Sequence, residues 1–254
     1  MTLRDYFQPE GQQRALAIYG TFASDQDWAI REKMDLYEAS RLAFDRRTDD
    51  RGAFGAFEKI YNTLAGSWQV FRPHSPLVCW PSRRIFETIR TEFSEFRWDS
   101  SVNLTNFING TRREALLSNL ASMAGIKPNQ GYPIMAVSKF LHFYNPGLFP
   151  IYDDAVIWKK VYKRFKNDHR EFCTASKLPY NMQDTSIFLR NYLGWASSLL
   201  ASAHPKFMEA FVAWLGRQSG IEVEKRGFAV SGLYSTAFEF TAIGAVEIEL
   251  KSNG

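Results

Sequence analysis

Apolar residues recur at helical spacing through most of this chain, and this pattern restricts the fold more than any other feature. In residues 9–47 they recur three or four positions apart, among Glu, Lys and Arg. Such spacing gives a helix one apolar face, which packs against a core. Comparable stretches follow at residues 53–65, 82–93, 111–125, 133–144, 184–203 and 205–218. We therefore expect a mainly α protein.

Helix-breaking and capping residues separate these stretches. Residues 49–52 carry a break, and Gly66 ends the second helical stretch. Ser82 belongs to the residue types that cap helix N-termini, so we expect a helix to begin there. Residues 145–147 (Asn-Pro-Gly) are a strong stop after the helix of residues 133–144.

The C-terminal tail has a different pattern. Residues 238–243 and 246–250 alternate polar with apolar positions and carry β-branched side chains, and Gly244 lies between the two segments. Alternation of this kind around a glycine predicts a short β hairpin. The expected fold class is thus mainly α, with two helical lobes around a cleft and a short C-terminal β hairpin.

The length and the composition fit one globular unit. The 254 residues are 45% apolar, enough for a sizeable core. We expect a single domain over residues 1–254, with one lobe from about residues 1–100 plus the C-terminal helices and a second from about 101–170. The 21 phenylalanines fit either a core rich in rings or a cleft that stacks on flat ligands.

Several sequence features bear on the compartment. The N-terminus is polar and charged, and no run approaches the length of apolar sequence that spans a bilayer. The two cysteines, Cys79 and Cys173, lie far apart and form no CxxC, so a disulfide framework is not expected. These features predict a cytoplasmic protein with no membrane partner.

Basic residues gather at a few predicted helices. The net charge of +4 permits nucleic-acid binding without requiring it. Some of these residues lie near expected helix N-termini, whose backbone amides bind anions, and others interleave with apolar positions in residues 154–166. We expect contacts with a DNA backbone from Lys127, Arg83, Arg84, Arg112, Arg113, Lys159, Lys160, Lys163 and Arg164. An ordinary solvated helix face is the alternative.

The signatures of several chemistries are missing. The four histidines are scattered, with no HExxH and no paired CxxC. The sequence has no GxxxxGK[ST], no GxGxxG after a strand and no GxSxG. We therefore expect no metal and no cofactor.

Residues 133–156 form the most patterned stretch of the chain. Lys139 and His142 lie on one face of the predicted helix, since residues three and four apart are neighbours. The following residues 149–151 (Phe-Pro-Ile) are too apolar for a surface loop, so we expect them to pack against the core. Such packing would direct Tyr152, Asp153 and Asp154 to one place at the start of the basic helix, where the helix dipole favours a carboxylate.

A helix, a turn through proline, an apolar Pro-Ile and an aspartate that opens the next helix together resemble the helix-hairpin-helix DNA glycosylase superfamily. Residues 149–153 are similar to the turn that precedes the family's catalytic aspartate, with one extra residue between proline and aspartate. Residues 120–126 are similar to the start of the family's hairpin. The resemblance covers about residues 115–156.

The resemblance implies a monofunctional enzyme that hydrolyses the N-glycosidic bond of a damaged or modified base flipped out of DNA. It implies that Asp153 stabilises the oxocarbenium-like sugar and orients water. Lys139 and Asp154 are the further candidates for the catalytic site. The candidates for a base pocket are Tyr152, His142, Trp80 and Tyr144. The partner would be DNA, and we expect a monomer.

Simpler interpretations remain open. Asp153 or Asp154 can be an N-cap only, and Lys139 can belong to a solvated face. The loop between Trp68 and Trp80 can be a base-stacking wedge or a packed loop. The whole chain can be a non-catalytic nucleic-acid-binding protein or a helical scaffold for protein interactions.

Overall fold

The structure is a computed structural model, and everything below concerns the residues that it describes. These are residues 1–24, 27–45, 47–68, 80–97, 103–104, 113–123, 126, 133–165, 182–219 and 230–252. All regular secondary structure in these residues is helical, so the expectation of a mainly α fold is confirmed. None of the helices in these ranges has both the length and the apolar character needed to cross a bilayer.

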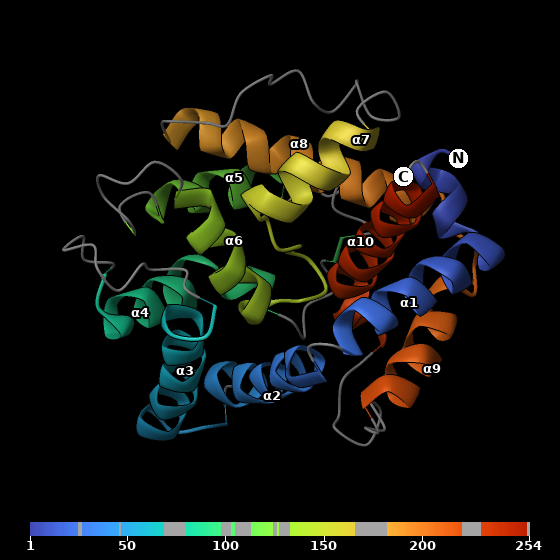
Figure 1. Cartoon of the computed structure of the whole chain (residues 1–254). Helices are drawn as coiled ribbons and strands as arrows, with labels where there is room; N and C mark the ends of the chain where they lie inside the picture. The colour runs from blue at the N-terminus through green and yellow to red at the C-terminus, as the bar shows by residue number, and fades with distance from the viewer. Residues whose placement is uncertain are drawn as a thin grey trace.

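Figure 1 shows the helices in chain order, coloured from blue at the N-terminus to red at the C-terminus. The first half of the chain holds η1 (Leu3–Phe7), α1 (Pro9–Ser24), α2 (Asp27–Phe44), α3 (Asp50–Ala65), α4 (Ser82–Glu92), η2 (Ser94–Phe96) and α5 (Arg113–Ser122). The second half holds α6 (Pro133–Tyr144), η4 (Asp154–Tyr162, wound as a π-helix), α7 (Lys163–Phe165), α8 (Met182–Ala201), α9 (Phe207–Ser219), η7 (Val230–Leu233) and α10 (Tyr234–Ser252).

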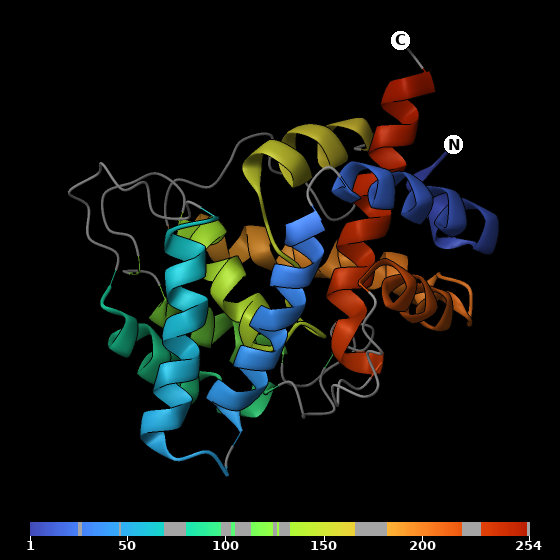
Figure 2. The ribbon, with the colours of Figure 1, turned by 60° about the horizontal axis from the view of Figure 1, so that its bottom comes forward.

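Helix α10 is a central element, and α1 packs along it (Figures 1 and 2). A side chain at Gly244 has no room, because an added Cβ would lie 2.0 Å from the backbone oxygen of Ala15. The glycine therefore lets the two helix backbones approach closely. Farther along α10, the N-terminal amine lies 3.8 Å from Glu249.

Aromatic rings fill the core where α2, α3, α4 and α6 meet. The ring of Phe44 lies 4.8 Å from that of Tyr144 and 5.9 Å from that of Phe86, measured between centroids. Phe57 packs on the same group, 5.3 Å from Phe86. These phenylalanines are core residues, which is one of the two uses that their abundance allows.

The predicted C-terminal β hairpin is wrong, because residues 234–252 form helix α10. Its side chains are buried on every face, from Ser235 through Ile248 with few interruptions. A helix buried all round has no polar face, so its sequence lacks the period that would identify it. Burial in the core also overrides the strand preference of its β-branched residues. The proposed division into two lobes stays a prediction.

Candidate functional site

The site begins at the end of α6, where the sequence predicts a stop. Asn145 fixes the turn, because its Nδ2 donates to the oxygen of Phe96 at 2.9 Å and its Oδ1 accepts from the backbone of Gly147 at 2.9 Å. The segment from Asn145 to Tyr152 is buried throughout. The predicted packing of residues 149–151 against the core is therefore confirmed.

His142 joins this segment to α2. Its Nδ1 lies 2.7 Å from the oxygen of Phe149, and its Nε2 lies 2.7 Å from the hydroxyl of Tyr37. A carbonyl can only accept, so Nδ1 carries the proton and Tyr37 donates to Nε2. Burial, aided by the positive charge of Lys33, holds the pKa of His142 well below its usual range. The neutral ring of His142 thus links α2 to the segment that follows α6.

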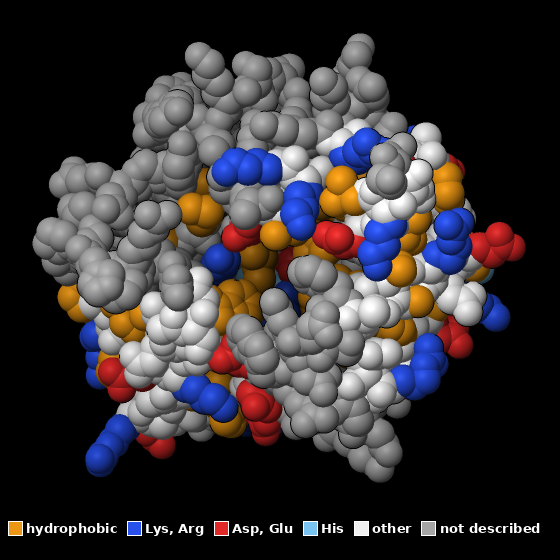
Figure 3. Space-filling model, in the orientation of Figure 1, with side chains coloured by type: hydrophobic (Ala, Val, Ile, Leu, Met, Phe, Trp, Pro, Cys, Tyr) orange, Lys and Arg blue, Asp and Glu red, His pale blue; other side chains and the backbone are white. Residues whose placement is uncertain are grey.

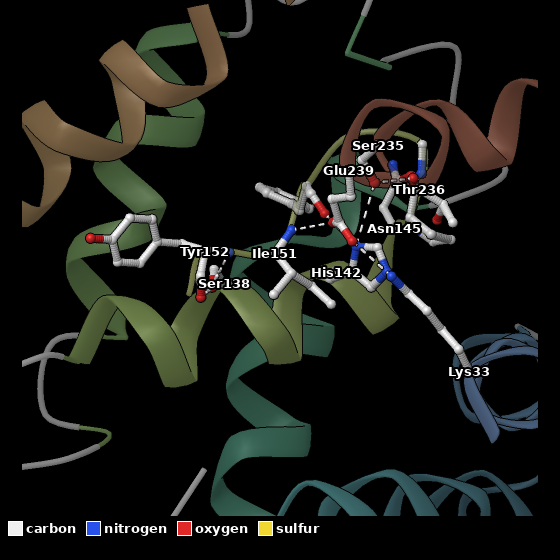
Figure 4. A network of polar contacts seen from close by, with 12 residues as sticks. Lys33, Ser138, His142, Asn145, Ile151, Tyr152, Ser235, Thr236 and Glu239 are labelled. Carbon is white, nitrogen blue, oxygen red and sulfur yellow. Dashed lines mark hydrogen bonds and ion pairs between the residues drawn. The ribbon is translucent and has the colours of Figure 1, made fainter. Parts of the chain in front are cut away.

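A buried ion pair lies beside His142 (Figure 4). Lys33 Nζ lies 2.7 Å from Glu239 Oε2, and both side chains are less than a tenth exposed. The other oxygen of Glu239 accepts the backbone N–H of Ile151. Burial raises the pKa of Glu239 although Lys33 opposes the shift. The pair therefore ties α2 and α10 to the backbone two residues before Asp153.

Two further helices hold the same backbone. From α8, the hydroxyl of Tyr192 donates to the oxygen of Ile151 at 2.9 Å. From α6, Ser138 Oγ accepts the backbone N–H of Tyr152 at 3.0 Å. The peptide groups that precede Asp153 are thus fixed from α6, α8 and α10 together.

Asp153 emerges from this support at the start of η4. Its Oδ1 accepts the backbone N–H of Val156 at 3.0 Å, so the side chain caps η4. Its Oδ2 lies 3.7 Å from Lys139 Nζ, and the two side chains are 32% and 11% exposed. Lys139 also lies over the ring of Trp68, 5.9 Å from its centroid. The structure therefore brings Lys139, Asp153 and an indole together.

The surface is hollowed near these elements. Figure 3 shows a hollow between α6, η4 and α10, with hydrophobic and charged side chains around it. Helices α6 and η4 carry Lys139 and the cap Asp153. The carboxylate of Asp153 is partly exposed and can contact a ligand, whereas the Lys33–Glu239 pair is buried and cannot.

Three of the four residues predicted for a base pocket lie in the core. His142, Tyr144 and Tyr152 are core side chains, at most 1% exposed. Tyr144 donates to the oxygen of Phe93, and Tyr152 points away from the cluster in Figure 4 toward the ring of Tyr192. As placed, these three residues offer no ring face to a base.

The fourth base-pocket candidate, Trp80, is half-buried, and the guanidinium of Arg84 covers its ring at 3.8 Å. Arg83 lies 4.1 Å over the ring of Phe54 and pairs with Glu87 at 3.6 Å. Both arginines are exposed on α4, so a role in contacting phosphates remains a prediction.

The basic residues of η4 and α7 lie against acidic residues of α10. Lys160 Nζ lies 3.1 Å from Glu247, and Arg164 lies 3.3 Å from Glu249. Lys159 is exposed. The side chains of Asp154, Lys163 and Arg113 lie outside the described part of the structure, as do Lys127 and Arg112 altogether.

Sequence reasoning missed Lys33, Glu239 and Tyr37, and it named Trp68 only as one end of the loop that can be a base-stacking wedge. Lys33 and Glu239 lie 206 positions apart, and no local pattern joins them. The one available signal is a charge inside an apolar run, since Glu239 lies between Phe238 and Phe240. A buried charge in such a run needs a partner.

The described residues contain no group of three or more His, Cys, Asp or Glu side chains that could hold a metal ion. Comparisons of this chain with protein-family models, curated proteins and solved structures find no match.

Proposed function

We propose that this protein is a monofunctional DNA glycosylase-like enzyme that removes a damaged or modified base, with Asp153 as its catalytic carboxylate. The observation that carries the proposal is the position of Asp153. It opens η4 directly after a buried Pro-Ile turn, about a third exposed, beside the ammonium group of Lys139. This is the aspartate that the resemblance to the helix-hairpin-helix glycosylases singles out.

The rigidity of its surroundings supports a catalytic role. A carboxylate that stabilises a developing positive charge works best when its position is fixed before the reaction. The cap bond to Val156 fixes Oδ1, and the backbone before Asp153 is held by Glu239, Tyr192 and Ser138. The Oδ2 atom is then the oxygen that faces an oxocarbenium-like sugar or an attacking water.

Lys139 and Trp68 have supporting roles in the proposal. The ammonium of Lys139 would contact a phosphate next to the flipped nucleotide. Trp68 is held by a bond from its Nε1 to Glu32 at 2.9 Å, and its ring would stack on a base. Because the proposed enzyme is monofunctional, Lys139 forms no Schiff base, and borohydride should trap no covalent complex with DNA.

The test is base release from defined DNA. Single- and double-stranded oligonucleotides, each with one oxidised, alkylated, deaminated or hypermodified base, are incubated with the protein. Free base is detected by mass spectrometry and abasic sites by alkaline cleavage. We expect release from at least one substrate, and a loss of about 100-fold or more in Asp153→Asn with DNA binding retained.

Other outcomes would support a different function. Salt-dependent DNA binding with no base release from any substrate would indicate a non-catalytic nucleic-acid-binding protein. The absence of both activities would favour a helical scaffold. Release that is unchanged in Asp153→Asn would refute the role of this carboxylate.

A further inference from the structure

A second hollow lies between α1 and α9, and none of the residues that line it belongs to α6 or η4. Its volume is about 420 Å³. Sites for small organic ligands commonly fall between roughly 300 and 1,000 Å³. The hollow is therefore large enough for a ligand of modest size.

The sequence explains why the two helices leave this space. They meet at one end, where Gln12 Nε2 donates to the oxygen of Phe207 at 2.8 Å. They meet again at the other end, where a Cβ on Gly20 would lie 3.4 Å from the ring of Trp214. Between these contacts α9 presents only the short side chains of Ala210 and Ala213. These short side chains leave the space over the middle of α9 unfilled, and the lining continues to Lys206 on one side and to Arg217 on the other.

The lining combines an apolar floor with basic groups. Leu16, Phe207 and Trp214 are buried beneath the hollow. Among the described residues, the titratable ones that line it are His204, Lys206 and Arg217, and none of the lining residues is acidic. Lys206 and Arg217 are exposed.

These basic groups are available to a ligand. Within the described ranges, neither Lys206 nor Arg217 forms an ion pair. His204 Nδ1 accepts the backbone N–H of Lys206 at 3.2 Å, so the neutral ring carries its proton on Nε2. All three side chains thus provide donors and no compensating negative charge.

We propose that this hollow binds a small organic anion, a carboxylate on an apolar body. The apolar body would lie on Leu16 and Trp214, where it displaces water from apolar surface. The carboxylate would accept from Arg217 or from Lys206, which lie toward opposite ends of the exposed side of α9. This site is independent of the function proposed for Asp153.

The test uses decanoate as the probe, titrated below its micellar concentration into the full chain by calorimetry. We expect one saturable site. The double variant Lys206→Ala with Arg217→Ala should weaken binding about tenfold or more, because the charge-assisted bond is lost whichever of the two residues forms it. Ala213→Leu should weaken it by a similar factor, because the new side chain fills the hollow.

Matched controls separate the site from general adsorption. Ala201→Leu places the same side chain on an exposed position of α8 and should leave the affinity unchanged. Decyltrimethylammonium has a comparable chain with the opposite charge and should not bind. The proposal is overturned if decanoate fails to bind the folded protein, if Ala213→Leu binds as well as the wild type, or if the cation binds equally.

Discussion

Two lysine–carboxylate pairs hold neighbouring parts of one turn, and they differ in almost every physical respect. Lys33 and Glu239 lie 2.7 Å apart in the core, and each is less than a tenth exposed. Lys139 and Asp153 lie 3.7 Å apart, and Asp153 is about a third exposed. Glu239 of the first pair holds the backbone of Ile151, and Asp153 of the second pair lies two residues later. A buried ion pair thus supports the backbone next to an accessible carboxylate.

The difference in exposure gives the two carboxylates different roles: Glu239 supports the fold, whereas Asp153 can contact a ligand. The oxygens of Glu239 accept hydrogen bonds from Lys33 and from the Ile151 N–H, and the side chain is buried, so it does not face a ligand. One oxygen of Asp153 accepts the N–H of Val156 and caps η4, and the other lies beside the ammonium group of Lys139. The buried pair costs desolvation and serves to fix geometry. The exposed pair can exchange its partner for a substrate.

Breaking the buried pair should have the largest effect on stability. Glu239→Gln leaves the ammonium of Lys33 buried without a countercharge, and we expect a loss of about 3–5 kcal/mol in the free energy of unfolding. Urea denaturation measures it. The double variant Lys33→Met with Glu239→Gln should recover much of this loss, because no buried charge remains and an amide oxygen can still accept the Ile151 N–H. A double variant no more stable than the single one would contradict the account.

The pH dependence of stability tests the neutral state of His142. Its pKa is held well below the usual value of about 6.5. Below that pH, the His142 ring is therefore protonated in the unfolded chain but stays neutral in the folded chain. Stability should then fall as the pH falls, by about 1.4 kcal/mol per pH unit from this group. His142→Gln should reduce the slope between pH 5.5 and 7.

The surface pairs between α7 and α10 should contribute less. Arg164 is 39% exposed where it meets Glu249, so Arg164→Ala should lower the free energy of unfolding by no more than about 1 kcal/mol. The effect should shrink at high salt. A loss as large as that of Glu239→Gln would contradict the account, because exposed and buried ion pairs would then contribute equally to stability.

The exposed carboxylate should have the smallest effect on stability. Asp153 caps η4 through Val156, and Asp49 caps α3 in the same manner through Gly52 at 2.8 Å. Asparagine caps helices about as well as aspartate, so Asp49→Asn should change the free energy of unfolding by less than about 0.5 kcal/mol. Asp153→Asn should add only the loss of the 3.7 Å pair with Lys139, for a total of no more than about 1 kcal/mol. Thermal and urea unfolding of both variants would measure the difference.

The sequence predicts those parts of the molecule that have a local period or a local stop. The bounds of α6, the buried turn after it and the C-terminal limit of α3 at Gly66 all follow from spacing and from breaking residues. The cap at Asp153 also follows, as one of two interpretations of its position.

The rest depends on tertiary structure. Helix α10 has no polar face to give it a period, and the link between Lys33 and Glu239 spans almost the whole chain. His142 and Tyr152 share the predicted stretch with Asp153, yet packing turns both into the core. The pattern of residue types does not determine which side chains of this turn face the core and which face the surface.

The most direct test of the central claim compares the two capping aspartates in catalysis. Single-turnover base release is measured at saturating protein for the wild type, Asp153→Asn and Asp49→Asn, on the best substrate from the panel. We predict that Asp49→Asn matches the wild type and that Asp153→Asn is slower by about 100-fold or more while binding DNA equally. Equal rates for the three proteins would contradict the account, because Asp153 would then be a helix cap and nothing more.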